Sequence, residues 1–440
     1  MAKRTVHPHR GMVAGGVRIP PSKYHLHRAL IFGSLAEGET VIHGRSEARH
    51  IHDTLRSLRD YGIAVRHTEN GYVVNGGPYR PRSGKIRVGS SGSTLQFMLG
   101  LGSLAQGRTP VYDGHKALRE RPIGPLLRAL GDLGIRWEAS GSKLPVTIYP
   151  GVVQGGRVQI PGTLSQWISG LLILAPFAKQ DTVIEALPPC NELTYVRLTI
   201  EMLRQFGIRV EEFPGGTQWR VPAGQTYRAA EIRIEPDLSS AAFPLVLSAL
   251  FPADVVLQGI AGTGTHPENK ILELMENFGL PLSYTGKYDG LRVRHAGKRP
   301  ASDLEIDMRH IPDLIPALSV LAAVSQGTTV LKNIGPGRLK ESDRVKAMRQ
   351  LNRMGARVEE LGDDLVIEGV ERLRGASIST FNDHRVQMAF TLAALKAETP
   401  SELTFPNAYK ISYPEFFDHL EALGVQAYAE TLQTEEAVRA

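Results

Sequence analysis

A glycine recurs along this chain at a nearly constant interval, each time between an amphipathic helical pattern and a short strand pattern. Helices commonly end in a left-handed residue, a conformation that glycine adopts without steric strain. The repeat therefore predicts a series of similar α/β units, each with a helix that ends at its glycine. The six glycines, Gly62, Gly134, Gly207, Gly279, Gly355 and Gly424, lie 72, 73, 72, 76 and 69 residues apart.

A second pattern recurs with the same period. A helical segment ends in small residues, a turn follows and a strand pattern begins, as in "SLAEGETVIHG", "SLAQGRTPVYDG" and "AAVSQGTTVLKNI". Six such units could close into a ring, stack as a solenoid or form two lobes of three. Solenoid units are usually shorter, about 20–50 residues, whereas three units together have the size of an ordinary domain. We therefore expect an α/β fold of two domains, with a cleft between them as the natural place for a ligand.

The composition excludes several classes of protein. The most apolar segment, residues 168–178, has about half of the ~20 residues that a membrane-spanning helix requires. No apolar stretch follows the basic residues at the amino terminus, so we expect no secretory signal. Cys190 is the only cysteine, which excludes an intrachain disulfide and favours a cytoplasmic location.

The positive charge of the chain points to anionic partners. The formal net charge is +6 and the isoelectric point is about 9.3. A basic balance of this kind suits nucleic acid, a membrane surface or a small acidic substrate. The arginines are scattered, and aromatic residues make up only 7% of the chain, so no basic stripe interleaved with aromatics indicates a nucleic-acid platform. We expect small anionic substrates, with neither nucleic acid nor membrane as partner.

Two acidic residues stand between two basic ones in "KESDR", residues 340–344. Taken alone, the stretch is typical of a solvated helix end, where each ion pair contributes a few tenths of a kcal/mol. However, several other polar stretches also stand just before helical patterns. Helix starts present free backbone N–H groups and a partial positive charge, so such stretches together could bind an anion.

Other catalytic and binding motifs fit the chain poorly. The loop "GSSGST" at 89–94 lacks the lysine of a Walker loop, and no GxGxxG follows a strand. Ser165 and Ser412 lack the context of a nucleophile elbow. Asp383 can be the N-cap of a helix, with His384 as a buried partner. The histidine pairs His7/His9, His25/His27 and His50/His52 have same-face strand spacing, but no further ligands with zinc spacing accompany them, so we expect no metal.

Eight polar stretches, in order over nearly the whole chain, resemble the motifs of the enolpyruvyl transferases, and in particular of the members that use shikimate 3-phosphate. The most specific are "PPSKYHLHRAL", "RERPIG", "SQWISGLL", "KESDR", "NDHRVQMAF" and "YKISYPEFF". The resemblance implies a two-domain inside-out α/β barrel in which each domain has three βαβαββ repeats. It places residues 1–15 with 237–440 in one domain and 16–236 in the other. Hinges near residues 15–20 and 235–238 and an active site in the interdomain cleft are implied as well.

The resemblance also implies a reaction. The enolpyruvyl group of phosphoenolpyruvate passes to a hydroxyl of an acceptor, phosphate leaves, and no cofactor or metal is needed by a monomeric enzyme. Arginine can bind carboxylate and phosphate oxygens with two parallel hydrogen bonds, which lysine does less well. The family's positions for phosphoenolpyruvate fall on Lys23, Gly92, Arg121, Gln166, Arg344, His384, Arg385 and Lys410.

The catalytic roles follow from the same resemblance. Glu341 would protonate the methylene carbon of phosphoenolpyruvate and later remove a proton, and Asp313 would act on the acceptor hydroxyl. Lys23 would assist the tetrahedral intermediate, and His384 completes the catalytic group. The acceptor positions fall on Arg28, Ser165, Tyr195, Asp313 and Lys340.

The acceptor side departs from the family pattern at several positions, which are Tyr24, Ser90, Gln96, Leu164, Glu192 and Pro336. Glu192 stands where the family has a phosphate-binding serine. A carboxylate about 4 Å from a phosphate costs on the order of several kcal/mol at a protein-like dielectric. Two alternatives therefore stay open: an enolpyruvyl transferase with a different acceptor, and a non-catalytic anion-binding protein of the same fold. The branch that acts on UDP-N-acetylglucosamine fits less well, because Cys190 is not in a comparable context.

Overall fold

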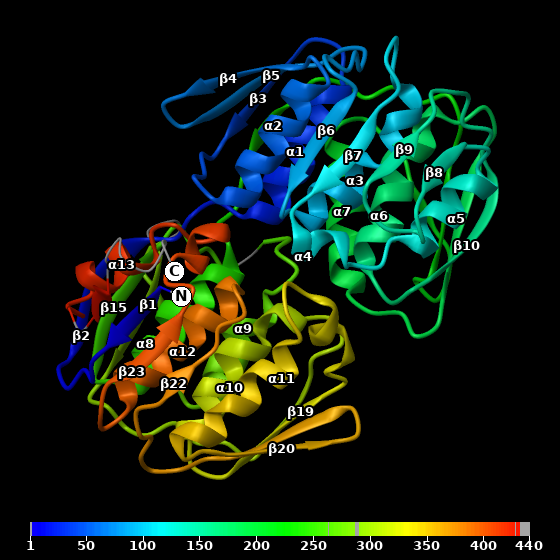
Figure 1. The fold of residues 1–440 in the computed structure, drawn as a ribbon. Helices are drawn as coiled ribbons and strands as arrows, with labels where there is room; N and C mark the ends of the chain where they lie inside the picture. Colours follow the sequence, from blue (N-terminus) through cyan, green and yellow to red (C-terminus); the bar gives the residue numbers. More distant parts are fainter. Residues whose placement is uncertain (1, 263, 287–289, 427, 432–440) are drawn as a thin grey trace, which may run out of the picture. The chain divides into compact units, whose positions relative to one another are not determined.

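The chain folds into two compact units, each with its own hydrophobic core (Figure 1). The computed structural model describes residues 2–262, 264–286, 290–426 and 428–431. Unit 1 consists of Met1–Pro20 with Pro236–Ala440, and unit 2 is Pro21–Glu235. The chain passes between the units at two points. Backbone hydrogen bonds tie the two crossing segments to each other on both sides. In unit 2 the Ser22 N–H donates to the Glu235 carbonyl, and in unit 1 the Asp237 N–H donates to the Pro20 carbonyl.

The architecture is mixed α/β, as predicted, and the residues that the structure describes form six four-stranded sheets that share one strand order. In each sheet a parallel pair is followed by two antiparallel neighbours. The sheets of unit 2 are β14 (Glu231–Arg233)–β3 (Glu39–His43)–β5 (Gly71–Asn75)–β4 (Ala64–Thr68), β6 (Lys85–Gly89)–β7 (Val111–Gly114)–β9 (Val146–Ile148)–β8 (Trp137–Ala139) and β10 (Gly156–Pro161)–β11 (Thr182–Leu187)–β13 (Gln218–Val221)–β12 (Glu211–Glu212).

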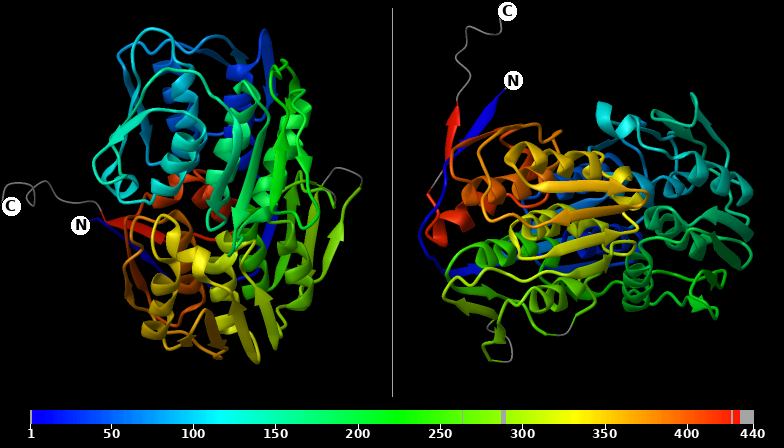
Figure 2. Two further views of the ribbon diagram at one scale, coloured as in Figure 1. Left: turned by 90° about the vertical axis from the view of Figure 1, so that its right-hand side faces the viewer. Right: turned by 90° about the horizontal axis from the view of Figure 1, so that it is seen from below.

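Unit 1 repeats this arrangement with strands from both ends of the chain. The amino-terminal strand β1 pairs with β23 and β24, so the blue and red ends of the chain lie side by side in one sheet (Figure 2). The sheets are β2 (Val13–Arg18)–β15 (Ala253–Gln258)–β17 (Leu291–His295)–β16 (Leu282–Tyr284), β18 (Leu304–Asp307)–β19 (Thr328–Lys332)–β21 (Asp364–Glu368)–β20 (Arg357–Leu361) and β22 (Ser377–Ile378)–β23 (Ser401–Thr404)–β1 (Lys3–Val6)–β24 (Tyr428–Thr431).

Apolar helices form the interior of each unit. Every residue of α8 and α10 in unit 1 is buried, because sequences such as "IPALSVLAAV" are apolar all round. Strands such as β15 alternate buried and half-buried residues, so one face of each sheet covers these helices. The inner helices are α1 (Lys23–Leu35), α3 (Gly92–Met98) and α6 (Ser165–Leu174) in unit 2, and α8 (Leu238–Leu250), α10 (Ile315–Val324) and α12 (His384–Lys396) in unit 1.

The remaining helices are more exposed or short. They are α2 (Arg49–Asp60), α4 (Lys116–Arg119), α5 (Gly124–Asp132), α7 (Leu193–Gln205), α9 (Lys270–Asn277), α11 (Arg344–Met348) and α13 (Phe416–Ala422), with the 3-10 helices η1 (Gly100–Leu104), η2 (Ala175–Phe177), η3 (Pro312–Leu314), η4 (Gly335–Leu339), η5 (Arg349–Met354) and η6 (Ala408–Ile411). Five of these helices, α2, α5, α7, α9 and α13, end two residues before one of the six periodic glycines. The remaining periodic glycine, Gly355, directly follows the 3-10 helix η5. All six glycines have positive φ, between 80° and 88°, which confirms the left-handed conformation predicted for them.

None of the three histidine pairs lies in a strand, so the strand-like spacing expected of them is wrong. His7 and His9 follow the end of β1 at Val6. His25 and His27 lie in α1, and His50 and His52 lie in α2. Residues two apart in a helix do not face the same direction, so their strand-like spacing carries no implication of a shared metal ion. In the part of the chain that the structure describes, no helix has both the length and the apolarity needed to cross a membrane.

Candidate active site

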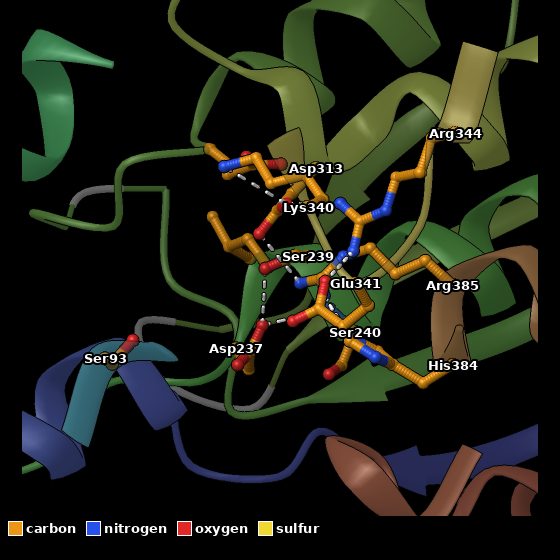
Figure 3. A network of polar contacts seen from close by, with 12 residues as sticks. Ser93, Asp237, Ser239, Ser240, Asp313, Lys340, Glu341, Arg344, His384 and Arg385 are labelled. Atoms are coloured by element: carbon orange, nitrogen blue, oxygen red, sulfur yellow. Dashed lines mark hydrogen bonds and ion pairs between the residues drawn. The ribbon is translucent and has the colours of Figure 1, made fainter. Parts of the chain in front are cut away.

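Three carboxylates of unit 1 converge on the guanidinium of Arg344. Figure 3 shows two of them, Asp313 and Glu341, together with Arg344. Arg344, the first residue of α11, is fully buried. Its Nε donates to Asp383 at 2.9 Å, and its Nη2 donates to Glu341 at 2.7 Å. Its Nη1 donates to Asp313 at 2.5 Å. "KESDR" therefore belongs to a buried ionic network, and the interpretation as a solvated helix end is wrong.

Helix starts position these side chains. Asp383 is the N-cap of α12, as predicted, and accepts the backbone N–H groups of Arg385 and Val386 at 2.9 and 3.4 Å. Asp343 caps α11 in the same way through the Lys346 N–H. Asp313 lies in η3, directly before α10. The loops before three helices thus bring together residues that are up to 70 positions apart, from Asp313 to Asp383.

Cations surround the three carboxylates. Arg385 Nη2 lies 3.3 Å from Asp313, and Lys340 Nζ lies 3.9 Å from the same side chain. Burial alone would lower the pKa of Arg344, but Asp383, Asp313 and Glu341 outweigh it and raise that pKa above its ordinary value. The Lys340 and Glu341 side chains are each 16% exposed, so these two members of the network reach solvent.

The three carboxylates do not use all the N–H donors of the Arg344 guanidinium. A guanidinium carries five N–H groups. Among the described residues, the three carboxylates take one each from Nε, Nη1 and Nη2. Two N–H groups therefore stay available for an additional acceptor, next to a carboxylate that reaches solvent.

The network could also be considered as a metal site. The donor atoms of Glu341, Asp383 and His384 all lie within 4.8 Å of one another. However, Glu341 and Asp383 already accept hydrogen bonds from Arg344, and His384 Nε2 contacts the Arg385 guanidinium. A divalent cation here would face two guanidinium groups at close range, which opposes its binding. The arrangement favours arginine as the counterion of these carboxylates.

A second group of predicted residues comes together in unit 2. Gly92 begins α3, and a Cβ at this position would lie 2.5 Å from Arg121 Nη1 and 3.4 Å from Gln166 Oε1. Gln166 Nε2 in turn donates to the Ser93 hydroxyl at 3.1 Å. Gly92, Arg121 and Gln166 therefore surround one small space at the start of α3.

We predict that Gly92→Ala displaces the Arg121 guanidinium and raises KM for phosphoenolpyruvate, the substrate that the motif resemblance implies, by about tenfold, because small displacements of a positioning group are costly in a binding site. Steady-state kinetics with varied phosphoenolpyruvate provides the measurement. Gly151→Ala is the matched control, since a Cβ at Gly151 meets nothing within 4 Å. An unchanged KM in the Gly92 variant would remove Arg121 from the proposed binding site.

The loop before Gly92 is held by a residue that the sequence analysis missed. Asp53, buried in α2, accepts the Ser90 N–H at 2.9 Å. Gly89 has a φ of 58°, and a Cβ there would lie 2.0 Å from the Asp53 carboxylate. No motif spacing links Asp53 to Ser90, which is 37 positions away, so only the fold shows this contact.

Threonines connect the helices that carry the predicted residues of unit 2. Lys23 and His27 both lie in α1. His27 Nδ1 is 2.7 Å from the Thr54 hydroxyl of α2, which is itself 2.7 Å from the Thr94 hydroxyl of α3. Burial lowers the pKa of His27 well below its ordinary value, and His50, Lys23 and Arg28 lower it further. His27 is therefore neutral in the folded protein at neutral pH.

The lowered pKa of His27 predicts a loss of stability in acid. Below the ordinary histidine pKa of about 6.5 the unfolded chain binds a proton that folded His27 does not, so the free energy of unfolding falls by up to about 1.4 kcal/mol per pH unit. His27→Gln should abolish this component between pH 6.5 and the folded pKa. Urea unfolding at pH 7 and pH 5 provides the measurement, with His52→Gln at an exposed position of α2 as the control. Equal acid sensitivity of wild type and the His27 variant would contradict the assignment.

The predicted acceptor residues of unit 2 lie around a buried cation. Arg28 donates from Nε to the Thr199 hydroxyl at 2.8 Å and from Nη2 to the Tyr195 carbonyl at 3.1 Å. Its guanidinium also packs 4.8 Å from the centre of the Phe97 ring. None of the contacts of Arg28 within the described residues is with a carboxylate. Burial lowers the pKa of Arg28 to about 9, which leaves it charged at neutral pH, so an acidic ligand would supply the missing countercharge.

A chain of hydrogen bonds at the start of α7 connects Ser165 to Arg28. The Tyr195 N–H donates to the Glu192 carbonyl at 2.9 Å. The Glu192 carboxylate accepts the Ser165 hydroxyl at 2.8 Å and the Ser165 N–H at 3.3 Å. Arg28, Tyr195 and Ser165 are therefore brought together, but the Ser165 hydroxyl is already bonded to a carboxylate of the protein.

The predicted residues fall into groups within each unit. Unit 1 gathers Asp313, Lys340, Glu341, Arg344, His384 and Arg385, and unit 2 gathers Gly92, Arg121 and Gln166 in one place and Arg28, Ser165 and Tyr195 in another, with Lys23 at the start of α1. Lys410 is not brought into the unit 1 network. It lies in η6, is exposed, and its Nζ is 5.7 Å from the centre of the neighbouring Tyr409 ring.

Comparison with known proteins identifies the class to which this fold and these residues belong. Residues 9–420 match the family model described as EPSP synthase (3-phosphoshikimate 1-carboxyvinyltransferase). The 3-phosphoshikimate 1-carboxyvinyltransferase of Methanocaldococcus jannaschii is 33% identical to the chain, and the alignment covers 93% of this chain and 96% of that protein. The enzyme of the same name from Methanocorpusculum labreanum is also 33% identical, with 94% of this chain and 97% of that protein covered. A solved structure of EPSP synthase from Acinetobacter baumannii superposes with a TM-score of 0.79 at 26% identity, over 98% of this chain and 100% of that one.

The chain therefore belongs to the EPSP synthase family, and the resemblance inferred from its motifs is confirmed.

Proposed function

We propose that this protein transfers the enolpyruvyl group of phosphoenolpyruvate to a hydroxyl of shikimate 3-phosphate and releases phosphate. The names of its relatives support the reaction. One observation in this chain carries it: Glu341, a carboxylate that reaches solvent, is held by the buried Arg344, which keeps two N–H groups for an anion. A proton-transferring group beside an anion-binding group is what addition to phosphoenolpyruvate requires.

Phosphoenolpyruvate carries a carboxylate and a phosphate, so its binding needs several cations. We propose that both units bind this one substrate and enclose it as a two-domain enzyme, with its active site in the interdomain cleft. Unit 2 would contribute Lys23, Arg121, Gln166 and the backbone at Gly92, where the lack of a Cβ lets the ligand come close. Unit 1 would contribute Arg344, Arg385 and Lys410.

Addition and elimination would follow one another in the reaction. The acceptor oxygen forms a bond to C2 of phosphoenolpyruvate, Asp313 takes the hydroxyl proton and Glu341 delivers a proton to the C3 methylene, which gives a tetrahedral intermediate. The C2–O bond to phosphate then breaks, and Glu341 removes a proton from C3, so that the double bond forms again. Lys23 would neutralise the departing phosphate, and His384 would support the proton transfers.

The acceptor would be bound by Arg28, Ser165 and Tyr195 of unit 2 with Asp313 and Lys340 of unit 1. Arg28 suits a carboxylate, because it is a buried cation whose contacts in the described residues are hydroxyl and carbonyl oxygens. Lys340 lies 3.9 Å from Asp313, so it can bind an acceptor oxygen beside the proposed base.

We further propose that the fold is a two-domain inside-out α/β barrel with three βαβαββ repeats in each domain, one domain corresponding to unit 1 and the other to unit 2. The strand order common to all six sheets supports this interpretation. The expected domains of 1–15 with 237–440 and of 16–236 are corrected accordingly, because β2 pairs with β15 of unit 1 from Val13 to Arg18. We also propose that the protein acts as a cytoplasmic monomer without a cofactor, and that its partners are the two small anionic substrates.

Phosphate release provides the test of the proposed function. Purified full-length protein with phosphoenolpyruvate and shikimate 3-phosphate is expected to release one phosphate per enolpyruvyl adduct, counted by a phosphate assay and by mass spectrometry of the product. Omission of either substrate should abolish release. Folded protein that binds phosphoenolpyruvate without release would shift the proposal to another acceptor, which a panel of hydroxylated acids, phosphorylated sugars and nucleotides would identify.

A further inference from the structure

Glu192 places a negative charge inside the group of residues proposed to bind the acceptor. It is buried at the N-cap position of α7, and its φ of 56° is left-handed, which is uncommon for a residue with a side chain. Its carboxylate bonds to both the backbone N–H and the hydroxyl of Ser165, the first residue of α6. A carboxylate of the protein thus occupies the positive end of a ten-residue helix.

Hydrogen bonds between two loops hold Glu192 in this place. The Gly162 N–H donates to the Leu187 carbonyl at 2.7 Å, and the Asn191 N–H donates to the Gly162 carbonyl at 2.8 Å. A Cβ at Gly162 would lie 2.8 Å from the Cys190 sulfur, so the two loops pack without spare room. The backbone that leads to Glu192 is therefore anchored to the loop before α6, which holds the base of its side chain near Ser165.

The backbone that carries Glu192 is linked to the buried Arg28 by way of Tyr195. Tyr195 connects the two, since its N–H bonds to the Glu192 carbonyl and its carbonyl accepts from Arg28. In the acceptor arrangement proposed above, a ligand held by both Arg28 and Ser165 would have the Glu192 carboxylate beside it, because that carboxylate bonds to Ser165.

The negative charge of the Glu192 carboxylate determines which chemical group of an acceptor can bind beside it. A phosphate would meet a like charge, and it would also compete with Glu192 for the N–H and hydroxyl of Ser165. A hydroxyl, in contrast, can donate a hydrogen bond to the carboxylate, and bonds to ionised groups are the stronger ones. The geometry thus favours a hydrogen-bond donor on this side of the acceptor.

From this geometry we infer that Glu192 is a specificity-determining residue, which selects against an anionic group on the acceptor and favours an acceptor that offers a hydroxyl there. The inference rests on the enolpyruvyl transfer proposed above. It deepens that proposal, because it predicts that the preference of this enzyme for shikimate 3-phosphate over unphosphorylated shikimate is weak and is set by one side chain.

Glu192→Gln separates charge from structure, because glutamine keeps the size of the side chain and an oxygen that can accept from Ser165. We expect the ratio of kcat/KM for shikimate 3-phosphate to that for shikimate to rise at least tenfold in this variant, mainly through a lower KM for shikimate 3-phosphate. KM for phosphoenolpyruvate should stay within twofold. Glu185→Gln removes one negative charge from β11, where Glu185 pairs with Arg157, and is expected to leave the ratio unchanged.

If Glu192 has only a structural role, the expected effect of Glu192→Gln on the ratio of kcat/KM for the two acceptors is different. If the carboxylate only ties the two loops together, Glu192→Gln would lower the melting temperature or reduce kcat/KM for both acceptors alike, and the ratio would stay constant. An unchanged or lower ratio in a folded variant overturns the inference.

Binding measurements keep this test independent of turnover. Calorimetry with shikimate 3-phosphate and with shikimate, on full-length wild type and Glu192→Gln, should show the same tenfold change in relative affinity. If neither compound is turned over by wild type, the proposed function fails, while the affinity ratio still decides the role of Glu192. If wild type already binds shikimate 3-phosphate far more tightly than shikimate and Glu192→Gln does not widen the difference, the inference fails while the proposed function stands.

Discussion

Turnover by Glu341→Gln is expected to be 10²- to 10⁴-fold lower than that of wild type, the range typical for loss of a general acid or base. Glutamine can accept the hydrogen bond that Arg344 Nη2 donates to Glu341 at 2.7 Å, so the network should stay intact. What glutamine cannot do is exchange a proton with C3 of phosphoenolpyruvate. We therefore expect the loss in kcat, measured by phosphate release, while the dissociation constant of phosphoenolpyruvate, measured by calorimetry, changes by less than about threefold.

Glu360→Gln is the matched control for this variant. Glu360 is also a carboxylate of unit 1 held by arginine, because Arg338 and Arg349 donate to it at 2.6 and 3.1 Å. Glu360 lies on β20 and, within the part of the chain that the structure describes, makes no hydrogen bond to Arg344, although its partner Arg338 also lies 3.4 Å from Asp343. Turnover of Glu360→Gln should therefore stay close to that of wild type. If Glu341→Gln kept a tenth or more of the wild-type kcat, another group would have to carry the proton, and Asp313 would be the next candidate.

Local sequence patterns predicted the helices, their ends and their burial well, because these features depend on residues that are near one another in the chain. The six periodic glycines all adopt the left-handed conformation that a helix end requires. Segments that are apolar on all sides, such as α10, are buried along their full length. Asp383 caps α12 as its position before "HRVQMAF" indicated. Each of these predictions depends only on residues within a few positions of one another, where sequence spacing and three-dimensional spacing agree.

Contacts between distant segments could not be predicted in this way. Asp53 and Ser90 are 37 positions apart, and Ser165 and Glu192 are 27 apart, and no pattern links either pair. The histidine pairs in α1 and α2 show a related error, because spacing in twos was interpreted before the local structure was known. The family resemblance named most of the candidate site residues, but it did not indicate that the hydroxyl of Ser165 is taken by a carboxylate of the same chain.

Replacement of Arg344 by lysine should have the largest effect on stability. Lysine keeps the charge but has one nitrogen, and it cannot reach three carboxylates that approach Nε, Nη1 and Nη2 from different directions. Asp383, which is fully buried, would lose the guanidinium that pairs with it and keep only uncharged donors such as the Arg385 and Val386 N–H groups. Removal of one member of a buried ionic network typically costs about 3–5 kcal/mol. We expect a loss of that size in the free energy of unfolding of unit 1, measured by urea denaturation at pH 7.

Activity should fall in parallel, because Arg344 also holds Glu341 and, in the proposed function, would offer its two remaining N–H groups to phosphoenolpyruvate. Loss of one aligned donor in a catalytic site typically costs about 10²- to 10³-fold in rate, so kcat/KM of Arg344→Lys should fall by at least that factor. Arg349→Lys tests the same chemical change at an exposed ion pair, where the cost should be about 0–1 kcal/mol with full activity. A folded Arg344→Lys enzyme with near-normal kcat/KM would show that a point charge suffices at this position. The three-way hydrogen bonding would then be a structural feature alone, and Glu341 would have to be held in place by other contacts.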